Sequence, residues 1–181
     1  MIWLILGVLL WMGAHWFKRL APGARAAMGN GGRGAVAVAS LGAIVLMVIG
    51  YRAAEPTPLW FVSWGVHLNN LAMIIAIVLM GVGASKSRLR AMMRHPMLTG
   101  ALIWALSHLL VNGDVPSLIL FGGMAVWAVG SMILINRAEP TYTPYQGGNM
   151  KGDLRLFIIS AVVFVVIVLV HGWIGPSPFP V

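Results

Sequence analysis

The sequence predicts an all-α protein, a polytopic bundle of transmembrane helices with about six spans. Three observations carry this prediction. The 181 residues are 60% hydrophobic and only 9% charged, whereas a soluble domain typically carries about 25% charged residues. Apolar runs near the length needed to cross a bilayer recur along the chain, and the basic residues gather between these runs. We expect one integral membrane domain over residues 1–181.

The six predicted spans are apolar runs separated by basic, glycine-rich or proline-containing loops. Trp60 and Trp64 near the start of the third run are typical interfacial anchors. Only the short segment 112–117 separates the fourth run from the fifth, which predicts a tight helical hairpin. The runs cover residues 2–17, 35–50, 59–83, 97–111, 118–135 and 154–173.

The formal net charge of +8 comes from 12 basic residues against four acidic ones. In a soluble protein this balance would suggest nucleic acid. Here the basic residues flank apolar runs, which indicates contacts with anionic lipid headgroups and no nucleic-acid partner. The first, third and fifth loops hold ten of the twelve, and an eleventh, Arg155, lies at the adjoining start of the sixth run. The positive-inside rule therefore predicts that these loops are cytoplasmic and that both termini lie on the other side.

Histidines and their neighbours in the spans are the candidate site residues. Stepping by four from Gly100 gives Trp104 and His108, so the three side chains share one face of the fourth span. The first span repeats this spacing and ends it at His15, and His67 lies near the start of the third span. An imidazole in a lipid-solvated helix is costly unless it has a partner or a function.

Two neutral imidazoles from different helices can ligate one haem iron axially. Depth in the membrane favours pairing His108 with His67, since both lie toward the outer ends of their spans, while His15 lies near the cytoplasmic end of its own. The alternative is that each histidine bonds a carbonyl or a hydroxyl between helices. The basic stretch 86–94 is either an interfacial anchor or an anion site, in which Arg94 contacts a haem propionate.

Several blocks of the sequence form a recognisable set. They are Gly13-Ala14-His15, Ala21-Pro22-Gly23, the His67 region, Arg94-His95-Pro96-Met97 with Gly100, Trp104 through Leu109, and Asn112-Gly113-Asp114. Together these blocks resemble the NnrU family of bacterial membrane proteins, and the likeness covers most of the chain. The resemblance implies a multi-pass protein of the bacterial inner (cytoplasmic) membrane, linked to nitrogen-oxide and nitric oxide metabolism in denitrification.

A related plant branch of the family is 15-cis-ζ-carotene isomerase, a haem b enzyme. The resemblance therefore implies haem b as cofactor, His15 and His108 as axial ligands, and a redox, nitric-oxide-responsive or isomerase-like activity. Resemblance favours His15 as the second ligand and depth favours His67, while His108 is common to both. A hydrophobic small molecule is a further candidate partner. The alternative function is that of a non-enzymatic membrane accessory or assembly protein with structural histidines.

Overall fold

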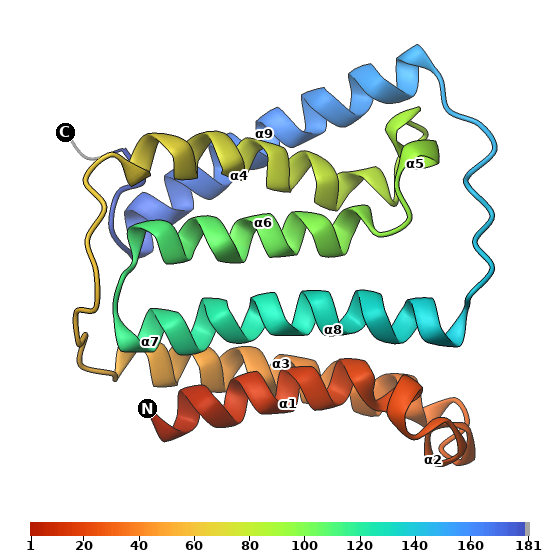
Figure 1. Ribbon diagram of the computed structural model, residues 1–181, viewed down its shortest axis with the longest axis horizontal. Coiled ribbons are helices and arrows are strands. Elements are labelled where there is room, and N and C mark those ends of the chain that lie inside the picture. Colours follow the sequence, from red (N-terminus) through yellow and green to blue (C-terminus); the bar gives the residue numbers. More distant parts are fainter. Residues whose placement is uncertain (180–181) are drawn as a thin grey trace. The chain divides into compact units, whose positions relative to one another are not determined.

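The computed structural model describes residues 1–179, and most of them are helical (Figure 1). The predicted all-α fold is confirmed. Over these residues the structure contains helices, one isolated bridge between Pro58 and Asp114, and no strand. The chain forms two compact units: unit 1 is Met1–Phe61 with Asn112–Pro140, and unit 2 is Val62–Val111 with the chain from Thr141 onward. The expectation of a single membrane domain stays a prediction.

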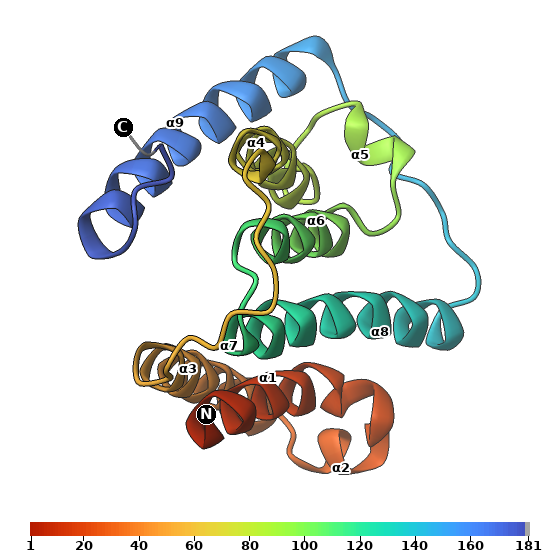
Figure 2. The ribbon, with the colours of Figure 1, turned by 60° about the vertical axis from the view of Figure 1, so that its left-hand side comes forward.

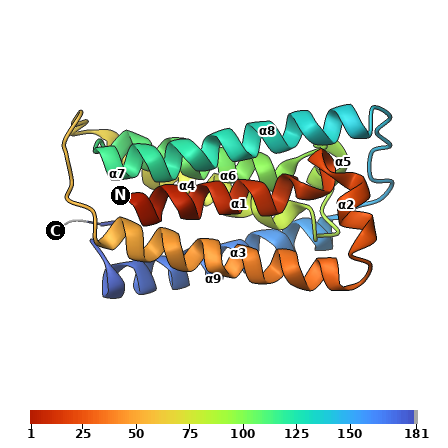
Figure 3. The ribbon, with the colours of Figure 1, turned by 90° about the horizontal axis from the view of Figure 1, so that it is seen from below.

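Unit 1 is built around the first helix of the chain, which packs against two others (Figure 3). Its elements are α1 (Ile2–Leu20), α2 (Pro22–Ala27), α3 (Gly31–Arg52), α7 (Val115–Ser117), the π-helical turn η1 (Leu118–Gly122) and α8 (Gly123–Ala138). The backbones of α1 and α3 are close at Gly7, where an added Cβ would lie 2.7 Å from the amide nitrogen of Met47. Close approach of helices at small residues is typical of membrane bundles.

The contact between α1 and α8 includes a tryptophan whose ring and N–H group both meet α8. The indole Nε1 of Trp16 donates a hydrogen bond of 2.9 Å to Oγ of Ser131. The ring passes over Gly130, whose added Cβ would lie 2.6 Å from Cζ2 of Trp16. At the end of the same helices, Arg19 and Glu139 form an ion pair of 2.8 Å. Gly130 thus leaves room for the indole ring of Trp16, and Ser131 accepts the hydrogen bond of its N–H group.

The segment before α4 pairs with the segment before α7 instead of extending the helix. The amide of Leu59 donates to the carbonyl of Gly113 over 2.6 Å, and the amide of Val115 donates to the carbonyl of Thr57 over 3.0 Å. The third span was predicted to begin at residue 59, but α4 begins at Gly65. The boundary was wrong because these amides bond to a loop more than 50 residues away, which no local pattern records.

Unit 2 consists of α4 (Gly65–Val82), α5 (Leu89–Met92), α6 (Pro96–Val111) and α9 (Met150–Ile174), with α4 in contact with both α6 and α9 (Figure 2). Glycines again mark the crossings. An added Cβ at Gly100 would lie 2.7 Å from the carbonyl oxygen of Ala76, and one at Gly81 would lie 2.9 Å from Cδ1 of Leu156.

Four helical segments are long and apolar enough to cross a membrane by length and composition: Gly31–Arg52, Gly65–Val82, Val115–Ala138 and Met150–Ile174. The first and last are longer than their predicted spans. The 19-residue α1 and the 16-residue α6 are not among the four. Membrane-helix character is therefore shown, while a total of six spans is not established by these lengths.

Candidate functional site

The helix α6 carries the stripe that the sequence analysis singled out. It begins at Pro96, whose fixed φ suits the first turn of a helix. Gly100 is buried against α4, and one and two turns later Trp104 and His108 are half-buried. The stripe therefore starts at a close contact between α6 and α4 and continues toward the C-terminal end of α6.

The ring of His108 is oriented by its own helix. Nδ1 of His108 lies 2.9 Å from the carbonyl oxygen of Trp104, and the two ring centroids are 5.3 Å apart with the planes at 49°. Because a carbonyl oxygen can only accept, Nδ1 must carry the proton. In this tautomer of the neutral imidazole the free lone pair is on Nε2, and Nε2 is then the atom that can ligate a metal.

The same arrangement occurs in unit 1, on the first helix. Nδ1 of His15 lies 2.8 Å from the carbonyl oxygen of Trp11, and the ring centroids are 4.1 Å apart. Gly7, one turn earlier, makes the close contact with α3, as Gly100 does with α4. The repeated Gly-xxx-Trp-xxx-His spacing is thus a repeated structure, in which glycine meets a neighbouring helix and tryptophan orients the imidazole.

Two indole donors beside His15 lack an acceptor. Trp127 of α8 lies edge-on to His15, with ring centroids 5.3 Å apart. In the part of the chain that the structure describes, the buried Nε1 atoms of Trp11 and Trp127 have no hydrogen-bond partner. Most buried polar groups in proteins are satisfied. An acceptor atom placed beside the two rings would satisfy both donors.

The structure brings His67 and His108 to the same end of unit 2. Gly65, at the start of α4, packs against the last turn of α6, since its added Cβ would lie 3.2 Å from side-chain atoms of Leu110 and Val111. His67 is in that first turn and its side chain is exposed. His15 belongs to unit 1. His67 thus shares a unit with His108, and the choice between His15 and His67 as its partner stays a prediction.

A further histidine reaches this end, and the sequence analysis did not include it. His171 lies in the last turn of α9, and its Nδ1 is 2.8 Å from the carbonyl oxygen of Pro176. It lies near enough to His108 for the two rings to interact electrostatically. The chain beyond α9 also returns to α4, where Asn70 donates to the carbonyl of Pro178 over 2.9 Å. The signal that could have found this is that the fourth and sixth predicted spans run in the same direction, so their C-terminal ends lie on the same side.

Arg94 lies at the opposite end of α6 from His108. The helix rises about 18 Å between its first residue and His108. The guanidinium of Arg94 is 5.3 Å from the ring centroid of Tyr142, and Arg90 lies 4.3 Å from that of Tyr145. The structure therefore places Arg94 in a basic end of unit 2, under a tyrosine-containing loop, and does not place it beside His108.

A carboxylate that sequence reasoning missed holds this basic end together. Asp153, buried in the first turn of α9, accepts from Oγ of Ser87 at 2.7 Å and from the amide of Arg88 at 2.9 Å. The side chain of Arg88 pairs with the same carboxylate at 2.6 Å. Gly152 lies against the carbonyl of Lys86, where no Cβ would fit. Only the fold reveals this site, because its two halves are 66 residues apart.

Over residues 1–179, no group of three or more His, Cys, Asp or Glu side chains could hold a metal ion. Apolar helices, oriented imidazoles and a basic end together define a helical integral membrane protein with histidine–tryptophan sites.

The family follows from comparison with known proteins. The model of the NnrU protein family matches residues 3–178. The match spans nearly the whole sequence, so this chain belongs to the NnrU family, as its sequence blocks predicted. No curated protein and no solved structure matches it.

Proposed function

We propose that this NnrU-family protein binds haem b in the bacterial inner membrane, with His108 as an axial ligand. The observation that carries the proposal is the hydrogen bond between Nδ1 of His108 and the carbonyl of Trp104. In metal-ligating histidines, the ring N–H group that does not face the metal commonly donates a hydrogen bond to such an acceptor. This bond fixes the tautomer and makes the other ring nitrogen a better ligand. The equivalent hydrogen bond at His15 fixes that imidazole in the same tautomer.

The surroundings of these rings support the proposal. The indole ring of Trp104 lies beside His108 and provides a flat, apolar surface. Beside His15, the indole N–H groups of Trp11 and Trp127 have no hydrogen-bond acceptor in the described part of the chain. Bound haem would supply an iron that exchanges electrons or binds nitric oxide, or that assists an isomerase-like reaction of a hydrophobic molecule. The family's link to nitrogen-oxide metabolism favours the first two.

The proposal includes the topology predicted from the sequence. The chain would cross the membrane six times, with α1 and α6 completing the four longer spans, and both termini would lie outside the cytoplasm. The loops rich in basic residues would then face the anionic cytoplasmic leaflet. In this orientation His67, His108 and His171 lie at the outer side of the membrane.

A haem titration of the purified protein in detergent tests the proposal and identifies the second ligand. We expect one haem per chain, no specific binding to His108→Ala, and unchanged binding to His95→Ala, which is the matched control. Comparing His15→Ala, His67→Ala and His171→Ala then decides the second ligand, since its loss should change the iron from six-coordinate to five-coordinate. Binding that is the same in wild type and His108→Ala would overturn the proposal.

A second candidate function is that of a non-enzymatic membrane accessory protein. The packing of His15 between two indole rings favours it, because an imidazole in such a cluster also stabilises helix contacts. This function predicts that histidine variants lower thermal stability while the absorption spectrum shows no cofactor in any of them. The haem titration therefore separates the two candidates.

A further inference from the structure

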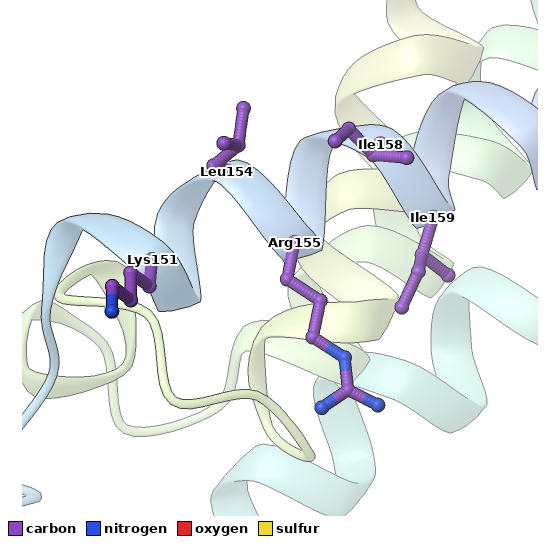
Figure 4. A pocket seen from close by; sticks show the side chains of 5 residues that line it. All are labelled: Lys151, Leu154, Arg155, Ile158 and Ile159. Carbon is purple, nitrogen blue, oxygen red and sulfur yellow. The ribbon is translucent and has the colours of Figure 1, made fainter.

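The first three turns of α9 present a face that is basic at one end and apolar along its length. Five side chains line a depression of about 300 Å³ on this face (Figure 4). In Figure 4 Arg155 and Ile159 extend to the same side of the helix. Their spacing of three or four residues places all five on one side of α9. They are Lys151, Leu154, Arg155, Ile158 and Ile159.

The positive charge of this face is not neutralised by the protein. Asp153 is the only carboxylate in these turns, and it is turned inward and bonded to Ser87 and Arg88. Within residues 1–179, neither Lys151 nor Arg155 forms an ion pair with an acidic side chain. Two exposed cations one helical turn apart therefore remain available to an anion.

The apolar part of the depression is exposed as well. Leu154 is 61% exposed, Ile158 54% and Ile159 49%, whereas Leu156 and Ser160 face α4 and are buried. A second depression lies beside it, lined by Arg88, Leu89, Met92, Asp153 and Phe157. Its arginine is already paired with its aspartate, so only the first depression combines uncompensated positive charge with an apolar wall.

We propose that this depression binds one anionic phospholipid. Lys151 and Arg155 would hold the phosphate, since an arginine fork matches phosphate oxygens and both stems can lie along apolar surface. An acyl chain would lie against Leu154, Ile158 and Ile159. The position suits this occupant, because α9 enters the membrane at its basic end and the positive-inside rule puts that end at the anionic leaflet. The site rests on the membrane placement of α9 and is independent of haem.

Native mass spectrometry of the detergent-solubilised protein tests the site. The probes are phosphatidylglycerol and phosphatidylcholine with identical acyl chains, added at equal concentrations. We expect phosphatidylglycerol to bind about tenfold more tightly, and the double variant Lys151→Gln/Arg155→Gln to lose that preference. The matched control Lys18→Gln/Arg33→Gln also removes two exposed, unpaired charges and should keep the preference.

Three results would overturn the proposal. The first is equal binding of the two lipids to wild type. The second is an equal loss of preference in the control variant, which would show that overall charge alone attracts the lipid. The third is displacement of the lipid by its water-soluble headgroup, glycerophosphoglycerol, at equal concentration, because the acyl chain would then contribute nothing. The His108→Ala variant should keep the lipid preference, so failure of the haem proposal is distinguishable from failure of this one.

Discussion

His108 donates from Nδ1 to the carbonyl oxygen of Trp104, one helical turn earlier, across 2.9 Å. His15 and Trp11 repeat this relationship at 2.8 Å in the other unit. In both cases the glycine one turn before the tryptophan touches a neighbouring helix. In each repeat the hydrogen bond fixes the imidazole in one tautomer, and the glycine contact fixes the position of the helix that carries it.

Gly100→Ala should lower the free energy of unfolding by about 1–3 kcal/mol, because the new methyl would press on the main chain of α4. The ideal Cβ lies 2.7 Å from the carbonyl oxygen of Ala76, and a main-chain atom cannot move aside cheaply. Unfolding in mixed detergent micelles, followed by circular dichroism, measures the change. The control is Gly172→Ala in α9, where no atom lies within 4 Å, and it should leave stability unchanged or slightly raised. Equal effects of the two substitutions would contradict the α4–α6 contact.

Ser87→Ala should destabilise the protein by about 1–3 kcal/mol, because the buried hydroxyl of Ser87 both donates and accepts a hydrogen bond and the substitution removes both bonds. Oγ of Ser87 donates to Asp153 and accepts from the amide of Leu89 at 3.1 Å. The same unfolding measurement applies. The exposed Ser63→Ala is the control and should stay within about 0.5 kcal/mol of wild type. A neutral Ser87→Ala would show that the hydrogen bonds of the Ser87 hydroxyl do not stabilise the basic end of unit 2.

Trp16→Phe and Ser131→Ala should be coupled by about 0.5–1.5 kcal/mol in a double-mutant cycle, because either substitution alone breaks the same hydrogen bond. The bond joins α1 to α8 across 115 residues of sequence. Free energies of unfolding for the two single variants and the double variant provide the coupling energy. Strict additivity would mean that the indole and the hydroxyl do not meet.

Single cysteines can report the topology without interference, because the chain has no cysteine of its own. Glu55→Cys, in the second loop, should react with a membrane-impermeant maleimide added to intact spheroplasts. Arg33→Cys, in the first loop, should react only after the membrane is permeabilised, because the positive-inside rule places it in the cytoplasm. The reverse labelling pattern would refute both the orientation and the outer position of His108.

Features of the fold that are determined by residues close together in the sequence were predictable, and features that depend on distant segments were not. The apolar run predicted at residues 97–111 forms the helix Pro96–Val111, and its bounds were predictable because a proline and the turn residues Asn112-Gly113 mark its ends. The start of α4 was missed because the amides of Leu59 and Trp60 bond to Gly113. Spacing alone indicated that Trp104 and His108 share a face, since helical geometry settles that question.

The parts of the candidate site that join distant segments could not be read from the sequence. Ser87 and Asp153 meet only after α4 and α9 have packed, and their types alone do not indicate a pair. His171 was not among the candidate residues, because only the fold shows that the last turn of α9 lies near His108. Whether a histidine ligates iron or packs against an indole depends on the atoms that surround it in three dimensions.

The visible absorption spectrum of the protein, purified from haem-supplied cells, tests the central claim most directly. The account predicts a Soret band that shifts on reduction in the wild type and is absent from His108→Ala, with the same helical content by circular dichroism in both. A wild-type spectrum without a Soret band, or one that His108→Ala leaves unchanged, would contradict it.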